Sequence, residues 1–119
     1  MKYACLIYSD EHDKTVNPER TSEAYGPIIA GYAAFGAEAG AAGVILGGEA
    51  LDDTATATSL RVRDGEVTTT DGPFAETKEH LGGFYILECD TLDEAMAWAA
   101  KIPHAATGTI EIRPVLDFG

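Results

Sequence analysis

The most unusual stretch with charged residues lies past the middle of the chain, between Asp71 and Gly83. Asp71 precedes a Gly-Pro pair that favours a turn, and Phe74 can anchor this connection to the rest of the protein. Glu76 and Lys78 then offer charges of opposite sign two positions apart. An ordered loop with these groups can supply polar contacts, or an acid or base, to a small ligand. The alternative is that Asp71 caps the turn and the other charges are solvated.

Three histidines are further candidates for proton transfer, because the ordinary pKa of histidine lies near neutrality. His12 lies in an acidic loop whose oxygen and nitrogen donors have no recognised metal-ligand spacing, so we expect no metal centre and no cofactor. We expect His80 at the surface. His104 follows a proline after the second helix, where it either caps the last helical carbonyls or faces a cleft; we favour capping. Asp71 and His104 are the candidate catalytic residues.

Aromatic side chains beside the charged loop suggest a binding site for a small molecule. Four of them would line a cleft between the helices and the sheet: Tyr8, Tyr25, Tyr32 and Phe74. Glu76 and Lys78 would add polar contacts to those of Asp71. Such a site can support proton transfer or elimination on a small aromatic or keto-enolic compound.

Hydrophobic patterns and turn residues predict the order strand, helix, strand, hairpin, strand, helix, strand. The expected strands cover residues 2–8, 44–46, 84–89 and 108–115. The hairpin pairs residues 58–63 with 66–70 around Asp64-Gly65, a strong two-residue turn signal. We expect residues 71–83 to form a loop. Two βα units separated by a hairpin are typical of a ferredoxin-like α+β sandwich.

Two different sequence patterns predict the two helices. An apolar stripe predicts the first helix from residue 18 or 19 to residue 42, starting after Gly26-Pro27 or kinked there. Thr91 and Glu94 have the spacing of a capping box, which opens a second helix that ends before Pro103.

The central strands are apolar on both faces. Tyr3, Cys5 and Ile7 point to one face of the first strand, and the residues between them point to the other. Strands of this kind need cover on both sides, whereas two helices can cover only one face of a four-stranded sheet. We therefore expect a second copy of the chain on the other face, which makes the protein a homodimer. Cys5 and Cys89 are expected in the core.

The composition describes one ordinary domain over residues 1–119, with 45% hydrophobic and 24% charged residues. Twenty acidic and eight basic residues give a net charge of −12, which argues against nucleic acid and anionic membranes as partners. No apolar run approaches the roughly 18 residues of a membrane-spanning helix, and the N-terminal residues are not typical of a signal peptide. Two cysteines form no disulfide framework. We expect a cytoplasmic protein.

Residues 71–79, Asp-Gly-Pro-Phe-Ala-Glu-Thr-Lys-Glu, resemble the signature of the DGPF proteins, a branch of the YCII-related family. The similarity covers nearly the whole chain, including Gly47-Gly48-Glu49, the 61–65 turn, Gly82-Gly83-Phe84-Tyr85 and the last strand. The resemblance implies a ferredoxin-like fold that forms a dimeric α/β barrel. Some relatives of this kind are degradative enzymes acting on small aromatic compounds. Many others resemble accessory proteins encoded beside extracytoplasmic-function sigma factors.

The chain departs from this family at two positions. The wider family often has a histidine on the first helix and an aspartate before a proline after the second, proposed as an acid/base pair. Here Tyr25 or Ile28 falls near the first position, and Ile102 precedes the proline. An enzyme would need a substitute from four residues: Asp71, Glu76, His80 or His104. Two hypotheses stay open: a small-molecule protein, with or without catalysis, and an interaction protein that docks on a regulatory partner such as a sigma factor.

Overall fold

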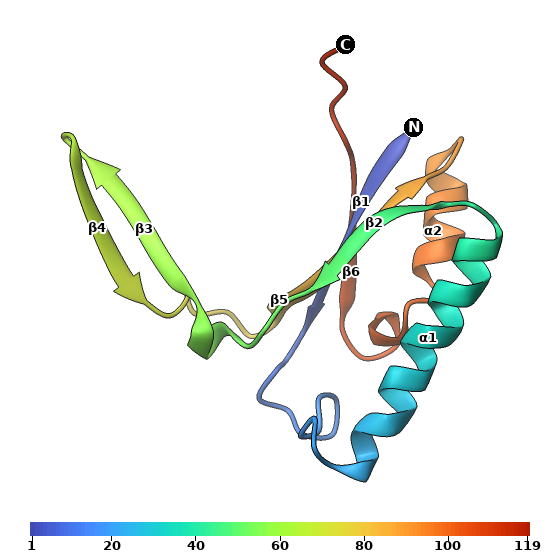
Figure 1. The fold of residues 1–119 in the computed structure, drawn as a ribbon, viewed down its shortest axis with the longest axis horizontal. Helices are drawn as coiled ribbons and strands as arrows, with labels where there is room; N and C mark the ends of the chain where they lie inside the picture. Colours follow the sequence, from blue (N-terminus) through green and yellow to red (C-terminus); the bar gives the residue numbers. More distant parts are fainter.

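The computed structural model describes residues 1–119 and contains the predicted order of elements (Figure 1). The strands are β1 (Lys2–Ser9), β2 (Ile45–Ala50), β3 (Thr58–Arg63), β4 (Glu66–Asp71), β5 (His80–Glu88) and β6 (Thr109–Pro114). The helices are α1 (Gly26–Ala41) and α2 (Leu92–Ala99), with short 3-10 turns η1 (Glu23–Tyr25), η2 (Thr54–Thr56) and η3 (Pro103–Ala105). No helix is both long enough and apolar enough to cross a membrane.

Four strands form an antiparallel sheet in the order β2-β5-β1-β6. Both helices lie on the same side of this sheet (Figure 1). The result is a small α+β domain consistent with the predicted ferredoxin-like fold. The pairing Ser9–His80 and Tyr8–Thr109 brings the end of β1 to the beginnings of β5 and β6. The loop after β1 and the η3 turn before β6 therefore meet at one end of the sheet.

The core lies between the sheet and the helices. Tyr3, Cys5 and Ile7 of β1 point toward the helices, as predicted, and each is at most 6% exposed. Phe35 of α1 packs on Tyr85 of β5, with 4.9 Å between ring centroids. The other core residues are small or apolar side chains: Ala39, Leu87, Cys89, Ala95, Ala99 and Ile102. Both cysteines are buried, and burial raises the pKa of the Cys5 thiol to about 11.

The first helix is shorter than predicted. It begins at Gly26, so the expected start at residue 18 or 19 is wrong, and the alternative start just after Gly26-Pro27 is correct to within two residues. Pro27 lies in its first turn, where the missing N–H is not needed and the fixed φ suits a helix. The residues before it form a looped connection from β1 (Figure 1). In contrast, the predicted cap of α2 is confirmed, because Thr91 Oγ1 accepts the Glu94 N–H at 3.2 Å.

Two strands are longer than their side-chain patterns indicated. β2 continues from Ile45 to Ala50, and β5 begins at His80 rather than Phe84. Both extensions are held by backbone pairing, in which Ala50 opposes Gly83. Because glycine has no side chain to alternate between faces, a glycine-rich strand has no readable period. The extension of β5 is what places His80 at the end of the sheet.

The β3–β4 hairpin is a separate two-stranded sheet that projects from the body as an arm (Figure 1). Its predicted turn is confirmed, with φ of 52° at Asp64 and 77° at Gly65, as a type I′ turn requires. Leu60, Val62 and Val67 are 51–60% exposed. The chain has a radius of gyration of 16.2 Å, against about 13.5 Å for a compact chain of this length. We name residues 58–71 the arm.

The second face of the four-stranded sheet has no cover within the chain. Ala4 opposes Ile86 and Leu6 opposes Phe84 on this side, and these four residues are partly exposed. None of them is among the partly buried apolar residues that pack against the core. We name this surface, centred on Leu6, Phe84 and Ile86, the open face. That a second copy covers it stays a prediction.

Candidate functional site

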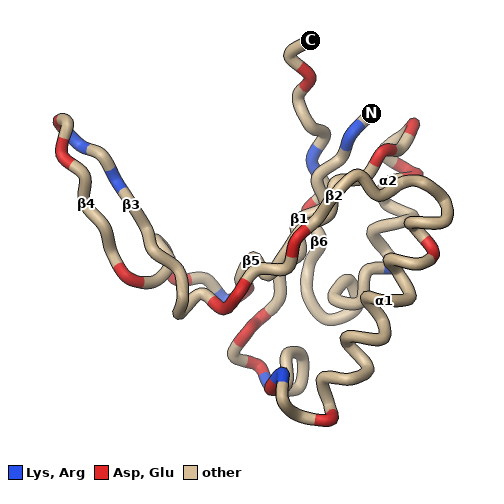
Figure 2. Tube along the Cα trace, in the orientation of Figure 1, with Lys and Arg blue, Asp and Glu red and all other residues tan.

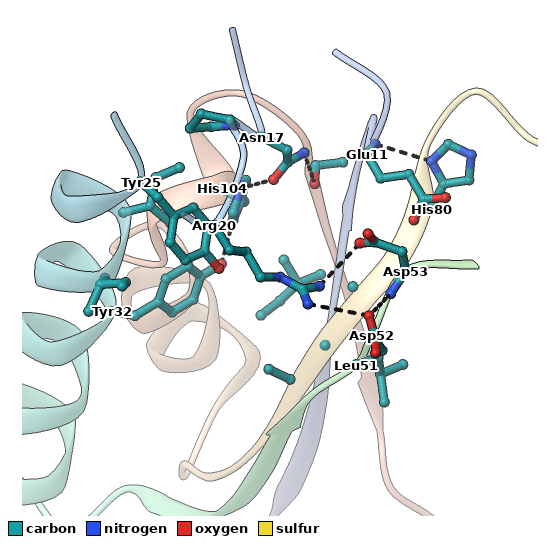
Figure 3. A pocket seen from close by; sticks show the side chains of 18 of the residues that line it. Glu11, Asn17, Arg20, Tyr25, Tyr32, Leu51, Asp52, Asp53, His80 and His104 are labelled. Atoms are coloured by element: carbon teal, nitrogen blue, oxygen red, sulfur yellow. Dashed lines mark hydrogen bonds and ion pairs between the residues drawn. The ribbon is translucent and has the colours of Figure 1, made fainter. Parts of the chain in front are cut away.

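A cavity of about 860 Å³ lies between α1 and the end of the sheet where the loop after β1 and η3 meet (Figure 3). This volume falls within the range typical of small-molecule sites. Its walls come from five parts of the chain: β1 with its following loop, α1, β2 with the residues after it, β5 and η3. Three tyrosines, Tyr25, Tyr32 and Tyr85, line it together with His104 and Asn17.

One stripe of α1 builds both the cavity wall and part of the core. Tyr25, at the start of α1, and Tyr32 are seven positions apart, which places them two turns apart on one face. Ile28 lies between them and also lines the cavity. The same stripe continues to Phe35, which is buried in the core. Tyr25 and Tyr32 therefore lie on the same face of the helix that packs into the core at Phe35.

His104 lies at the centre of a hydrogen-bonded chain of side chains. The Tyr32 hydroxyl lies 2.6 Å from His104 Nδ1, and His104 Nε2 lies 2.9 Å from Asn17 Oδ1. The Asn17 amide nitrogen donates to the backbone oxygen of Asp10 at 2.9 Å and to Ser9 Oγ at 3.0 Å. This fixes the amide orientation, so that Oδ1 can only accept from His104. His104 therefore has its proton on Nε2, and Nδ1 accepts the Tyr32 hydroxyl.

Burial decides the protonation states of His104 and Tyr32. It lowers the pKa of His104, an effect partly offset by a hydrogen bond to the backbone of Val16. It also raises the pKa of Tyr32, with a smaller contribution from nearby Tyr85. Both groups are therefore neutral near pH 7. A neutral imidazole in contact with a tyrosine hydroxyl can accept a proton through that hydroxyl, which is the requirement for general base chemistry.

The short turn that holds His104 is fixed against β1. The N–H of Gly108 donates to the His104 backbone oxygen at 2.7 Å. A Cβ at position 108 would overlap the backbone oxygen of Tyr8, so only glycine fits where the chain turns into β6. The imidazole therefore extends from a turn that is closely packed on the central strand.

The loop after β1 and the connection after β2 both line the cavity. Both segments contain acidic residues (Figure 2). Arg20 links these two segments, with 3.3 Å to Asp52 and 3.1 Å to Asp53 (Figure 3). All three side chains are more than half exposed. The ion pairs are thus a surface contact across the mouth of the cavity.

The acidic side also contains the group of residues best suited to hold a metal. Glu11 and His80 both line the cavity, and the Glu11 backbone N–H donates to His80 Nδ1 at 3.3 Å (Figure 3). His12 lies beside them, with 5.1 Å between the two imidazole centroids. One ligand atom from each of Glu11, His12 and His80 lies within 4.8 Å of the other two.

The structure divides the residues that the sequence proposed. It brings Tyr25, Tyr32 and His104 together in the cavity. Tyr8 lies outside it and pairs with Leu81 and Thr109 on the sheet. The remaining four lie on the arm or in the segment after it, all exposed: Asp71, Phe74, Glu76 and Lys78. The side chains of Asp71, Glu76 and Lys78 make no hydrogen bond or ion pair within the chain.

The expected capping role of His104 is wrong, and the alternative, that it faces a cleft, is confirmed. Its ring nitrogens contact Tyr32 and Asn17, not the carbonyls that end α2. Sequence patterns gave no indication of Asn17, Arg20 and Tyr85. Asn17 precedes a proline in a polar loop, a position that predicts only a turn; its partner His104 is 87 positions away.

Comparison with known proteins agrees with this architecture. The model of the YCII-related domain matches residues 1–119. The chain belongs to the YCII-related family. An uncharacterised protein of Rhizobium meliloti (strain 1021) is 38% identical over 117 residues, which cover 97% of this chain and 92% of that protein.

This YCII-related chain has no acid where the resemblance implies an aspartate. Ile102, which precedes Pro103, is 1% exposed and belongs to the core. His104 lies two positions later and reaches the first helix through Tyr32. A hydrogen-bonded pair, Tyr32 and His104, therefore connects the first helix with the segment that follows the second.

Proposed function

We propose that this YCII-related protein binds a small aromatic or keto-enolic compound in the cavity and transfers a proton on it through Tyr32 and His104. The observation that supports the proposal is the chain Asn17–His104–Tyr32, which fixes a neutral imidazole behind a hydroxyl that lines the cavity. Tyr25, Tyr32 and Tyr85 provide faces on which a flat ring can stack. His104 then replaces the acid/base pair that the chain lacks.

The proton route follows from the hydrogen bonds. A proton leaves an acidic C–H or O–H of the bound compound for the Tyr32 oxygen as the Tyr32 proton moves to His104 Nδ1. The bound compound becomes an enolate or phenolate, and His104 becomes an imidazolium whose Nε2–H still donates to Asn17. The raised pKa of Tyr32 excludes a standing phenolate, so the two transfers are coupled. Return of the proton to a different atom of the compound completes an isomerisation or elimination.

Deuterium exchange tests this proposal without knowledge of the natural substrate. The α-protons of pyruvate, oxaloacetate and acetylacetone exchange with D₂O through their enols, and NMR measures the rate. We expect the wild-type protein to accelerate exchange of at least one compound, and Tyr32→Phe to remove about 10²-fold or more of that acceleration. Tyr3→Phe is the matched control, because it removes a hydroxyl from the core rather than from the cavity. Equal rates in Tyr32→Phe and wild-type protein would contradict the proton route.

We also propose that two copies pair through the open face, which would give the dimeric α/β barrel that the resemblance to the DGPF branch implies. The apolar centre of this face, Leu6, Phe84 and Ile86, lacks cover within the chain, and burying it is favourable by about 25 cal/mol for each Å². Sedimentation should give twice the mass of the chain. Ile86→Glu should give the monomer, whereas Ala30→Glu on the exposed side of α1 should not. A monomeric wild-type protein would contradict the pairing.

A second candidate function is that of an interaction protein acting with a regulatory partner, such as a sigma factor. The arm supports it, because Leu60, Val62 and Val67 share one face of the hairpin and are more than half exposed. The net charge of −12 favours a basic partner. Capture of a basic protein that is lost at high salt, and lost in Leu60→Ser, would support this candidate. Accelerated exchange together with no captured partner would exclude it in favour of the first.

A further inference from the structure

A three-residue donor set lies on the acidic side of the cavity, away from Tyr32 and His104. Glu11 and His12 follow β1, and His80 begins β5, 69 positions after Glu11. The pairing of Ser9 with His80 brings these segments together. His12 Nε2 lies 3.7 Å from Glu11 Oε1, and all three ligand atoms lie within 4.8 Å of one another.

The Glu11 carboxylate is ionised and held in place. Thr54 binds it twice: the backbone N–H donates to Oε2 at 3.1 Å, and the hydroxyl donates to Oε1. Burial alone would raise the pKa of Glu11, but these bonds and the nearby His80 and His12 together lower it. The Glu11 side chain is 15% exposed, whereas that of His12 is 77% exposed. The carboxylate is therefore a fixed ligand and His12 is the adjustable one.

We propose that Glu11, His12 and His80 bind one zinc-like divalent cation. Two imidazoles and one carboxylate form a ligand set that suits Zn²⁺, with room for a fourth ligand such as water. Bonds of about 2.0–2.1 Å in a tetrahedron require ligand atoms closer together than the 4.8 Å limit, and the exposed His12 can move inward. His80 would bind the cation through Nδ1. The bond to the metal would replace the long hydrogen bond of 3.3 Å that Nδ1 accepts from the Glu11 N–H.

The acidic surroundings favour a cation at this position. Asp10 and Asp13 flank the two ligands on the loop, and Asp52 and Asp53 line the same cavity. The Thr54 contacts are the kind of outer partner that fixes a metal-binding carboxylate. Because Glu11 and His80 line the cavity, the cation would lie at its edge, where an oxygen of a bound compound could take the fourth position.

Titration of the metal-free protein with Zn²⁺ tests the site directly. We expect saturable binding of one Zn²⁺ per chain, and with Co²⁺ the visible absorption of a four-coordinate site. His80→Ala should remove this binding. His12→Ala and Thr54→Val should each weaken it by about tenfold or more. His12 is exposed, so its replacement leaves folding intact even if the Glu11 or His80 variants do not fold.

Two control variants separate this site from binding of Zn²⁺ elsewhere on the acidic surface or at His104. Glu23→Gln removes an exposed acid from η1, in the same connection between β1 and α1, and should leave the Zn²⁺ affinity unchanged. His104→Asn should also retain the Zn²⁺ affinity, because His104 contacts Tyr32 and Asn17 rather than the three ligands, and the metal site does not depend on the proposed proton transfer. The proposal would be overturned if the wild-type protein shows no saturable Zn²⁺ binding. It would also be overturned if His12→Ala and His80→Ala both bind Zn²⁺ with the wild-type affinity.

Discussion

The cavity and the segment after the arm differ in how their chemical groups are assembled. Residues 71–79 place four charged residues within nine positions, and all but one of these four side chains are exposed. The cavity instead joins Asn17, Tyr32 and His104, which are separated by up to 87 positions. Contacts between distant residues are what bury His104 and fix its proton. A dense run of charge along the chain is thus a weaker indicator of a reactive site than a histidine whose partners come from other elements.

The largest difference between the cavity and residues 71–79 is expected in the rate of proton exchange. His104→Ala should slow proton exchange of a responsive compound by about 10²–10⁴-fold, because the proton acceptor is lost. Asp71→Asn and Lys78→Ala should leave the rate unchanged. The rates are measured by NMR in D₂O on folded protein. Loss of exchange in Lys78→Ala would contradict this difference between the two regions. It would show that the segment after the arm reaches a cavity, such as that of a second copy.

Stability should differ between the body and the arm. Leu87 is fully buried, and Leu87→Ala should lower the free energy of unfolding by about 2–5 kcal/mol through lost burial and a cavity. Val62 is 51% exposed on the arm, and Val62→Ala should change the free energy of unfolding by no more than about 0.5 kcal/mol. Urea denaturation measures both. A large, concentration-dependent effect of Val62→Ala would mean that the arm is buried in an assembly.

Acid should destabilise the protein through His104. Its folded-state pKa is lowered by burial below the ordinary value of 6.5, so the unfolded chain binds this proton first as the pH falls. Stability is therefore unaffected by this group above 6.5 and decreases as the pH falls from 6.5 to the folded-state pKa. The carboxyl groups with lowered pKa, such as Glu11, add their losses below 4.5. Urea denaturation between about pH 5 and 7 should show a smaller slope in His104→Asn; the same slope would contradict a buried neutral imidazole.

The smallest effect is expected at the mouth of the cavity. Arg20 and its two aspartates are exposed, and ion pairs of this kind contribute little and are screened by salt. Arg20→Met should therefore move the urea midpoint slightly at low salt and not at all at high salt. A loss of stability comparable to that of Leu87→Ala would show that the loop after β1 depends on this contact.

Sequence patterns predicted the parts of the fold that follow local rules. The alternation in β1, the Asp64-Gly65 turn and the Thr91 cap are each specified by a few neighbouring residues and are present as expected. The extension of β2 and the early start of β5 were missed because strand pairing through glycine leaves no side-chain pattern. For the start of α1, the sequence left two alternatives, residue 18 or 19 and the Gly26-Pro27 pair. The later start is observed, because proline suits a first turn and not a helix interior.

The candidate site was only partly predictable for a related reason. Tyr25 and Tyr32 follow from helical spacing on an apolar stripe. The orientation of His104 depends on Asn17 and Tyr32, and no local rule links these positions. The approach of His80 to Glu11 depends on the register of β1 with β5. Residue types suggested the chemistry, and only the fold shows which residues meet.

The state of His104 can be measured by long-range ¹⁵N NMR of the imidazole nitrogens. Three histidines give three sets of signals, and His104→Asn assigns the set in question. We predict a neutral ring at pH 7 with the proton on Nε2 and a pKa below 6.5. A proton on Nδ1 would show that His104 does not accept the Tyr32 hydroxyl, and a pKa above 6.5 would show that burial does not hold the ring neutral. Either result would contradict the proposed proton transfer.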